Sequence, residues 1–170
     1  MYASSVLFVA KFGLQETTQL LQDEERLLTE QLLKDAMAGT WTGTPSADEQ
    51  AAAMRALARL ERQLSTSSSL MDGYLRAVMA LPLAADDANT GTLEDCCLAL
   101  ARCGLADDAD NATDRIEAAA QTWRQWLKDI AARRVQLVMP SGDAPAPTGS
   151  VRSGRARSSI DWSGFGPGGC

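Results

Sequence analysis

The four cysteines are the first residues of this chain that could do chemistry. Cys96 and Cys97 are neighbours, Cys103 follows in the same stretch, and Cys170 closes the sequence. Neighbouring side chains on a helix diverge by about 100°, so Cys96 and Cys97 cannot both point into one tetrahedral metal site. No CxxC pair and no spacing typical of a secreted disulfide framework is present. We therefore expect reduced thiols, with Cys96 and Cys97 serving as small core residues.

Two further patterns could bind ions, and neither is complete. Carboxylates gather between residues 107 and 114, but this stretch lacks the turn glycine and the closing glutamate of a calcium loop, so helix capping explains them better. The glycine-rich residues 164–169 lack the Lys-Ser/Thr of a phosphate loop. The chain has no histidine, which excludes an imidazole base and a His-containing metal site within it. We expect no enzyme, no metal site and no cofactor.

The last thirty residues are polar and rich in Gly, Pro and Ser, yet they carry large side chains suited to binding a partner. Such a segment cannot bury enough apolar surface to offset its own ordering entropy, so it is expected to be disordered until it docks on another surface. The predicted partner-binding residues are three arginines followed by three apolar side chains: Arg152, Arg155, Arg157, Ile160, Trp162 and Phe165.

Composition favours one helical domain with an extension. The chain has 170 residues, of which 45% are hydrophobic; Ala and Leu dominate, while β-branched and aromatic residues are sparse. The helical pattern stops at Met139-Pro140. We predict an all-α fold, a small helical bundle with one long helix in residues 1–140, and an extended docking tail in residues 141–170.

The net charge of −6 is unevenly placed. Residues 1–140 hold 13 Lys/Arg against 20 Asp/Glu, whereas residues 141–170 hold three Arg against two Asp. An acidic body repels nucleic acid and anionic membranes, so only the tail could bind DNA. No segment approaches the length of a transmembrane span, and the apolar residues 6–9 meet Lys11 too soon for a signal peptide. We expect a cytoplasmic product without membrane contact.

Four helices are expected from the apolar spacing. The first spans Glu16 to Ala38 through its leucines. The second begins at a capping box, Ser46 with Glu49, and its apolar spacing, which includes Met54, continues through the serine run 65–69 to about residue 80, with Pro82 beyond its end. This spacing fits either one long helix, which we favour, or two helices that share a register across a polar kink at the serines.

The third and fourth helices follow acidic links. The third opens at Thr92, buries Leu93, Cys96, Cys97, Leu100 and Cys103, and ends at Gly104. The fourth is capped by Asp110 or Asn111. One face of this helix is marked at heptad-like spacing by Ile116, Ala119, Ala120, Trp123, Leu127, Ile130 and Arg134. Trp126 lies beside that face, and Trp123 and Trp126 are expected to be core residues or anchors of a subunit interface rather than parts of a cofactor site.

Several short runs, taken in their order and spacing, resemble a known family. They are MYA (residues 1–3), FG (12–13), MDGYLR (71–76), LPL (81–83), WLKDIAARRVQL (126–137) and DWSGF (161–165). The chain resembles the head-to-tail connector proteins, also called adaptor or head-completion proteins, of Mu-like phages and prophages. It departs from them between Gly13 and Ser46, where an additional helix-length stretch intervenes.

The resemblance implies a structural virion protein of the phage neck, assembled in the bacterial cytoplasm. Such proteins form a ring, expected here to be dodecameric, between the portal of the filled capsid and the stopper and tail proteins. Their C-terminal segment reaches the portal or a neighbouring subunit, and DNA passes through the ring without specific binding.

Two other classes share some of these features. An acidic helical-bundle chaperone or secretion and assembly partner would have this size and charge, but it would be a dimer and would need no aromatic-tipped tail. A small regulator that binds nucleic acid through the tail arginines is the weaker alternative.

Overall fold

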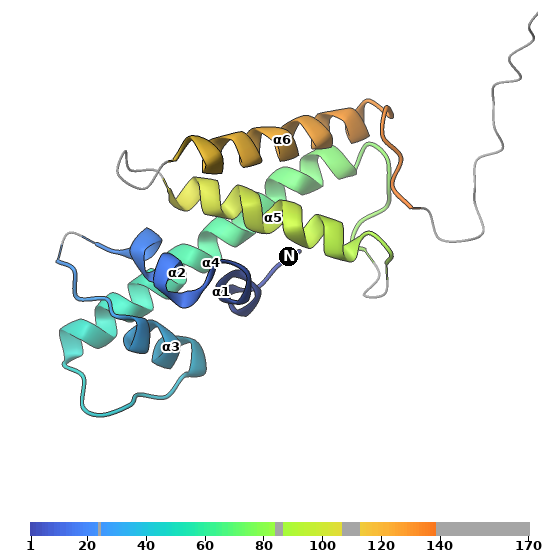
Figure 1. The fold of residues 1–170 in the computed structure, drawn as a ribbon. Helices are drawn as coiled ribbons and strands as arrows, with labels where there is room; N and C mark the ends of the chain where they lie inside the picture. The colour runs from blue at the N-terminus through green and yellow to red at the C-terminus, as the bar shows by residue number, and fades with distance from the viewer. Residues whose placement is uncertain (24, 84–86, 107–112, 139–170) are drawn as a thin grey trace, which may run out of the picture. The chain divides into compact units, whose positions relative to one another are not determined.

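The computed structural model describes residues 1–23, 25–83, 87–106 and 113–138, and within these ranges it is all-α, as predicted (Figure 1). No helix of the described part is long and apolar enough to cross a membrane. The predicted division into a helical domain and a tail from residue 141 stays a prediction, because residues 139–170 lie outside these ranges. The helices are α1 (Ser5–Phe12), α2 (Leu14–Leu21), α3 (Glu30–Ala38), α4 (Ala47–Leu75), α5 (Thr90–Leu105) and α6 (Asp114–Ala131).

The long helix α4 is continuous and starts at the predicted capping box. The Ser46 hydroxyl accepts a hydrogen bond from the Glu49 amide at 3.3 Å, and the Glu49 carboxylate accepts one from the Ser46 amide at 2.7 Å. The serine run does not interrupt it: the Ser69 hydroxyl donates to the carbonyl four residues earlier, and Ser67 and Ser68 are buried.

Two details of α4 differ from the prediction. The helix ends at Leu75, before the expected end near residue 80, and residues 76–78 form turns in which the Val78 amide donates to the carbonyl three residues earlier, that of Leu75, at 2.9 Å. Met54, predicted on the buried stripe, is 53% exposed. Small residues fill that part of the buried face instead: Ala52, Ala53 and Ala56.

The predicted single helix over residues 16–38 is wrong, since the chain forms α2 and α3 with a non-helical connection between them. Gln22 leaves helical geometry with ψ 139°, and Arg26 has φ +51°. Thr29 then caps α3 by accepting a hydrogen bond from the Leu32 amide at 3.2 Å. The apolar spacing did not reveal the break because the leucines on both sides of it are buried: Leu20, Leu21, Leu28, Leu32 and Leu33.

A helix that the sequence did not predict, α1, precedes α2. Ser4 caps it by accepting a hydrogen bond from the Leu7 amide at 3.3 Å, and Phe8 is its fully buried residue. The two helices join at Gly13, whose φ of +86° favours glycine. The chain can therefore turn sharply there, and both short helices pack beside α4.

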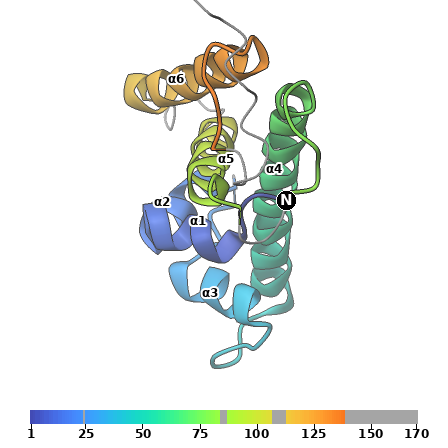
Figure 2. The same cartoon turned by 90° about the vertical axis from the view of Figure 1, so that its right-hand side faces the viewer.

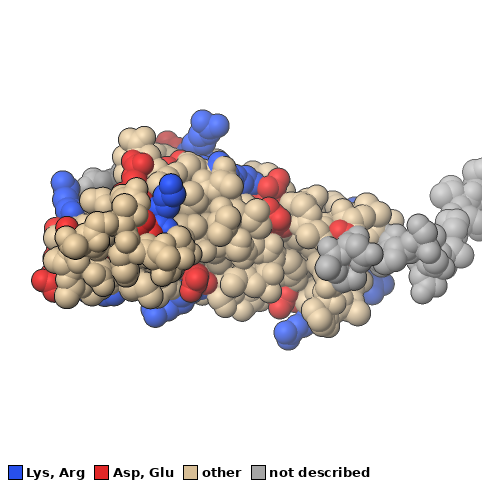
Figure 3. Space-filling model, turned by 90° about the horizontal axis from the view of Figure 1, so that it is seen from below, with Lys and Arg blue, Asp and Glu red and all other residues tan. Residues whose placement is uncertain are grey.

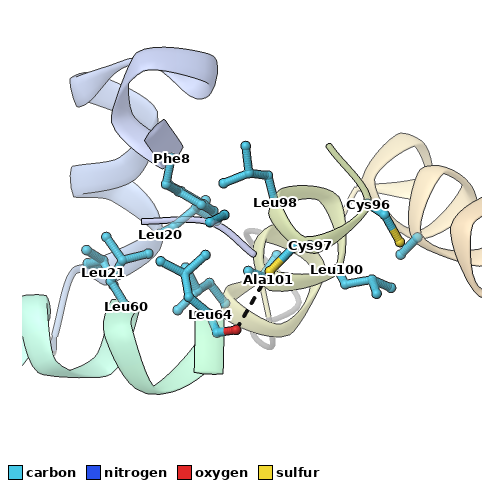
Figure 4. Packing of buried hydrophobic residues seen from close by; sticks show 14 of the residues in the cluster. Phe8, Leu20, Leu21, Leu60, Leu64, Cys96, Cys97, Leu98, Leu100 and Ala101 are labelled. Atoms are coloured by element: carbon cyan, nitrogen blue, oxygen red, sulfur yellow. Dashed lines mark hydrogen bonds between the residues drawn. The ribbon is translucent and has the colours of Figure 1, made fainter. Parts of the chain in front are cut away.

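The long helix α4 packs against each of the other described helices, and α5 packs against both α4 and α6 (Figure 2). Buried side chains of α1, α2 and α4 meet those of α5 in one cluster (Figure 4). Leu93, Cys96, Cys97 and Leu100 are buried as predicted, whereas Cys103 is only half-buried. The helix begins at Thr90, two residues before the expected start.

The neighbouring thiols point to different partners, as their helical spacing requires. Cys97 faces α4, where its Sγ lies 3.7 Å from the Leu64 carbonyl oxygen, and Cys96 points toward α6 (Figure 4). Burial raises the pKa of both thiols, that of Cys96 to about 12. Both cysteines are free and buried, which confirms that they are core residues.

Gly104 does not end α5, contrary to the prediction, because the helix continues to Leu105. A Cβ atom built on Gly104 would lie 1.9 Å from Nε2 of Gln63 on α4. The glycine therefore serves a close contact between α4 and α5 rather than a left-handed turn.

Helix α6 is capped by Thr113, which accepts a hydrogen bond from the Ile116 amide at 3.4 Å. Because Thr113 is the cap, the prediction that Asp110 or Asn111 caps this helix is wrong; both of these residues lie outside the described ranges. Four predicted face residues are buried, namely Ile116, Ala120, Leu127 and Ile130.

The C-terminal end of α6 also differs from the prediction. The helix ends at Ala131, and Arg133 with φ +57° turns the chain out of helical geometry, so the pattern does not continue to residue 139. Ala119 and Arg134, which belong to the face marked by the spacing, are exposed. Arg134 instead pairs with Asp129 at 3.2 Å.

Candidate assembly surfaces

The segment from which the tail departs is held by one side chain, Asn89. Its Nδ2 donates to the Val138 carbonyl at 2.8 Å, and its Oδ1 accepts from the Val138 amide at 2.9 Å. Asp87 accepts hydrogen bonds from Nδ2 and from the amide of Asn89, at 2.7 and 2.8 Å. Asn89 is 4% exposed. These contacts, which we call the tail-root clasp, fix the last described residue to the start of α5.

The first residues of the chain are tied to α4 and thereby to α5. The Tyr2 hydroxyl donates to Asp72 at 2.5 Å, and the Tyr2 amide donates to the Ser68 hydroxyl at 3.2 Å. Ser68 in turn lies 3.5 Å from the sulfur of Cys97 on α5. Burial, together with the hydrogen bond to Asp72, raises the pKa of Tyr2. Tyr2 and Asp72 belong to two of the runs that carry the family resemblance.

Trp123 and Trp126 form an edge-to-face pair on α6. Their ring centroids are 5.3 Å apart and the rings are inclined by 87°. Both side chains are half-buried against the core, so each keeps one part accessible on this outer helix. Their predicted role at a subunit interface stays a prediction.

A hollow of about 630 Å³, which we call the Phe12 cleft, opens where α1 and α2 face α5 and α6. The guanidinium of Arg102 lies over the ring of Phe12 at 4.7 Å from its centroid. Glu16 holds that guanidinium at 2.5 Å. The cleft is lined by Phe12, Gly13, Leu14, Gln15, Glu16, Gln19, Leu20, Arg102, Thr113 and Ile116. Sequence reasoning missed this site because its walls come from four helices.

A second hollow of about 630 Å³ lies near the tail-root clasp. Asp72, already engaged by the Tyr2 hydroxyl, and the exposed Arg76 are its charged residues. Leu81, Pro82 and Leu83 contribute its apolar wall, together with Met1 and Thr90. We call it the Arg76 hollow.

Charges of both signs are interspersed over the face seen in Figure 3. No large patch of one sign stands out on that face, so it offers no basic surface of the kind that grips nucleic acid.

The six predicted partner-binding residues all belong to the tail. Arg152, Arg155, Arg157, Ile160, Trp162 and Phe165 all lie outside the described residues, and so do Asp107, Asp108 and Asp110. Asp114 is exposed in the first turn of α6. Within the described ranges, no three His, Cys, Asp or Glu side chains gather where they could hold a metal ion.

The helical body lies within a stretch of sequence that matches a known protein family. The family model described as Bacteriophage Mu, Gp36 matches residues 2–155. The chain belongs to the phage Mu Gp36 family. The match runs through residues 14–45, where the sequence was expected to depart, and it ends before the apolar tip of the tail. The Gp36 family assignment makes this a structural or assembly protein of a Mu-like phage. No curated protein and no solved structure matches the chain.

Proposed function

We propose that this protein is a non-enzymatic head-to-tail connector of the phage neck. In this proposal it forms a homo-oligomeric, dodecameric ring beneath the portal of the filled capsid and prepares the site for the stopper and tail proteins. The observation that carries the proposal is the match to the phage Mu Gp36 family. The matched residues 2–155 include all of the helices that the structure describes.

The composition of the chain supports an assembly role rather than a catalytic one. It contains no histidine for acid-base catalysis, and its first 140 residues hold 13 Lys/Arg against 20 Asp/Glu. A ring of such subunits repels the phosphate backbone, so DNA can pass through without sticking to the wall. In this proposal the protein uses no cofactor and makes no specific contact with DNA.

The tail is the proposed link to the portal or to the next subunit. Trp162 and Phe165 are the side chains expected to contribute most of the binding energy, because aromatic anchors dominate protein interfaces. The tail arginines would pair with acidic surface on the partner. The tail-root clasp supports this role because it gives the tail a fixed point of departure.

The mass of the purified protein, measured with and without the portal of the same phage, tests this function. A connector should give a ring in complex with the portal, whereas a chaperone would remain a dimer and leave the portal unbound. Failure to bind the portal would refute the proposal.

A tail deletion gives a second test. Removing residues 150–170 should preserve helical circular dichroism and abolish entry into phage particles. The matched control replaces residues 141–149 with a Gly/Ser linker of equal length, keeping the apolar tip, and should enter particles normally. Normal incorporation of the deleted protein would contradict the proposed role of the tail.

A further inference from the structure

We propose that the Phe12 cleft binds the apolar end of the tail, residues 160–165, of a neighbouring copy of this chain. The inference rests on the proposed ring function and specifies which contact joins one subunit to the next. In this proposal the tail binds a second copy of the chain. Binding of the tail to its own subunit or to the portal would contradict it, and the test below distinguishes these cases.

The cleft offers a preorganised aromatic platform. The rings of Phe8 and Phe12 form an inclined pair with centroids 4.8 Å apart and an angle of 62° between the planes, and the fully buried Phe8 holds the Phe12 ring in place. Arg102 is held over the same ring by Glu16, and these two side chains are only 26% and 33% exposed. An incoming aromatic ring would therefore meet a fixed ring and a fixed guanidinium, both of which attract aromatic side chains.

The size and chemistry of the cleft match the end of the tail. A volume of about 630 Å³ lies within the range that holds a drug-sized ligand, and hence two or three large side chains. Half-buried Phe12 and Leu14 and the buried Leu20 and Ile116 supply apolar wall. Trp162 and Phe165 stand among glycines in the sequence, so a chain bearing them can approach such a wall closely.

Charge favours this cleft over the Arg76 hollow. The cleft and the adjoining first turn of α6 carry more carboxylates than cations, with Glu16, Asp114 and Glu117 against Arg102 and Arg115. In the Arg76 hollow, Asp72 and Arg76 are one carboxylate and one cation, so its lining carries no excess of negative charge. A tail whose cations precede its apolar tip is therefore attracted more strongly to the first site than to the second.

Geometry allows the contact to propagate around a ring. The tail-root clasp lies at the start of α5, whereas Arg102 lies 13 residues further along it, about 20 Å away at about 1.5 Å per residue. Residues 139–162 can span at most about 80 Å. A tail that leaves one end of a subunit and binds the other end of the next makes a head-to-tail contact, which is the kind of interface that closes into rings.

Photocrosslinking tests the contact directly. Full-length protein carrying p-benzoylphenylalanine in place of Phe165 is mixed in ¹⁴N and ¹⁵N forms, irradiated alone at high concentration and in complex with the portal, and mapped by mass spectrometry. We expect crosslinks between light and heavy chains to residues 12–20 or 113–117.

Two surface variants make the test specific. Gln19 is exposed and lines the cleft, so Gln19→Arg should lower the yield of these crosslinks about tenfold by repelling the tail arginines. Gln121→Arg, an exposed site on α6 outside the cleft, should leave the yield unchanged. Circular dichroism should show both variants folded.

Each other outcome overturns the inference. Crosslinks within one chain would place the tail on its own subunit, crosslinks to the portal alone would make the portal its partner, and crosslinks between copies at other helices would rule out the cleft. Absence of crosslinks between copies at the cleft, with and without portal, also refutes it. Portal binding measured in the same samples reports separately on the connector function.

Discussion

The tail-root clasp makes a quantitative prediction about Asn89→Ala. The substitution removes two hydrogen bonds, of 2.8 and 2.9 Å, between a buried side chain and the backbone of Val138. Each contributes about 1 kcal/mol net, so the free energy of opening this segment should fall by about 2 kcal/mol. Because 1.4 kcal/mol corresponds to a factor of about ten, hydrogen exchange at the Val138 amide should accelerate about thirtyfold.

Hydrogen exchange followed by NMR measures the opening of this segment directly, because the Val138 amide itself donates a hydrogen bond to Asn89. Asn89→Asp should be at least as damaging, since a carboxylate cannot donate to the Val138 carbonyl and would lie against Asp87. Thr90→Ala is the matched control. It removes a neighbouring hydrogen bond, from the Thr90 hydroxyl to the Asp87 carbonyl at 2.7 Å, without touching Val138. An unprotected Val138 amide in the wild type, or unchanged exchange in Asn89→Ala, would refute the clasp.

Three further predictions concern the helical body. Gly104→Ala should raise the free energy of unfolding by up to about 1 kcal/mol, because alanine favours the helix and only the flexible end of the Gln63 side chain must move to make room. A lower free energy of unfolding, measured by urea denaturation, would show that Gln63 cannot move aside. Thiol labelling of the native protein should modify Cys103 at least about a hundredfold faster than Cys97, because Cys97 is buried and its burial raises its pKa. Equal labelling rates of the two cysteines, measured by mass spectrometry of the peptides, would contradict the packing of α5. A hydrogen bond from the Thr42 amide lowers the pKa of Asp35 in the folded protein, so the ionised carboxylate stabilises the fold above its unfolded-state pKa of about 4, and this stabilisation is lost as the pH falls toward the lower folded-state pKa. Asp35→Asn should therefore flatten the fall of Tm below about pH 4. An unchanged dependence of Tm on pH in this variant would argue against the stabilising role of Asp35.

The parts of the fold that sequence predicted depend on local signals. The capping box at Ser46 and the spacing of Leu60, Leu64 and Met71 are both contained within the segment that forms α4. Local chemistry of this kind is sufficient to start a helix and to assign its buried face. The same holds for the buried face of α5, where the two cysteines behave as small apolar residues.

The errors arose where local preferences compete. The leucine spacing continues across residues 22–29, although the backbone leaves helical geometry there and Thr29 starts a new helix. Thr113 capped α6 in place of two nearby residues with equally good capping side chains, a choice that periodicity does not decide. Gly104 was assigned to a turn because its contact with α4 is not visible in sequence.

The candidate sites were the least predictable part. The Asn89 clasp joins residues 49 apart, and the Arg102–Glu16 pair joins residues 86 apart. Contacts at such separations follow from packing rather than from any local pattern. Only the tail residues and the tryptophan pair could be chosen from sequence, because large aromatic side chains in a polar segment or on an outer helix stand out by composition alone.

The two anchored ends of the helical body have a practical consequence for labelling. Met1 and Thr90 line the same hollow, and Asn89 holds Val138, so a tag fused ahead of Met1 would stand beside the point where the tail departs. The connection between α3 and α4, exposed at residues 43 and 44 beyond the hydrogen bond between Thr42 and Asp35, lies at the other end of α4 (Figure 1). Fluorophores or affinity peptides inserted there would leave both chain ends unobstructed.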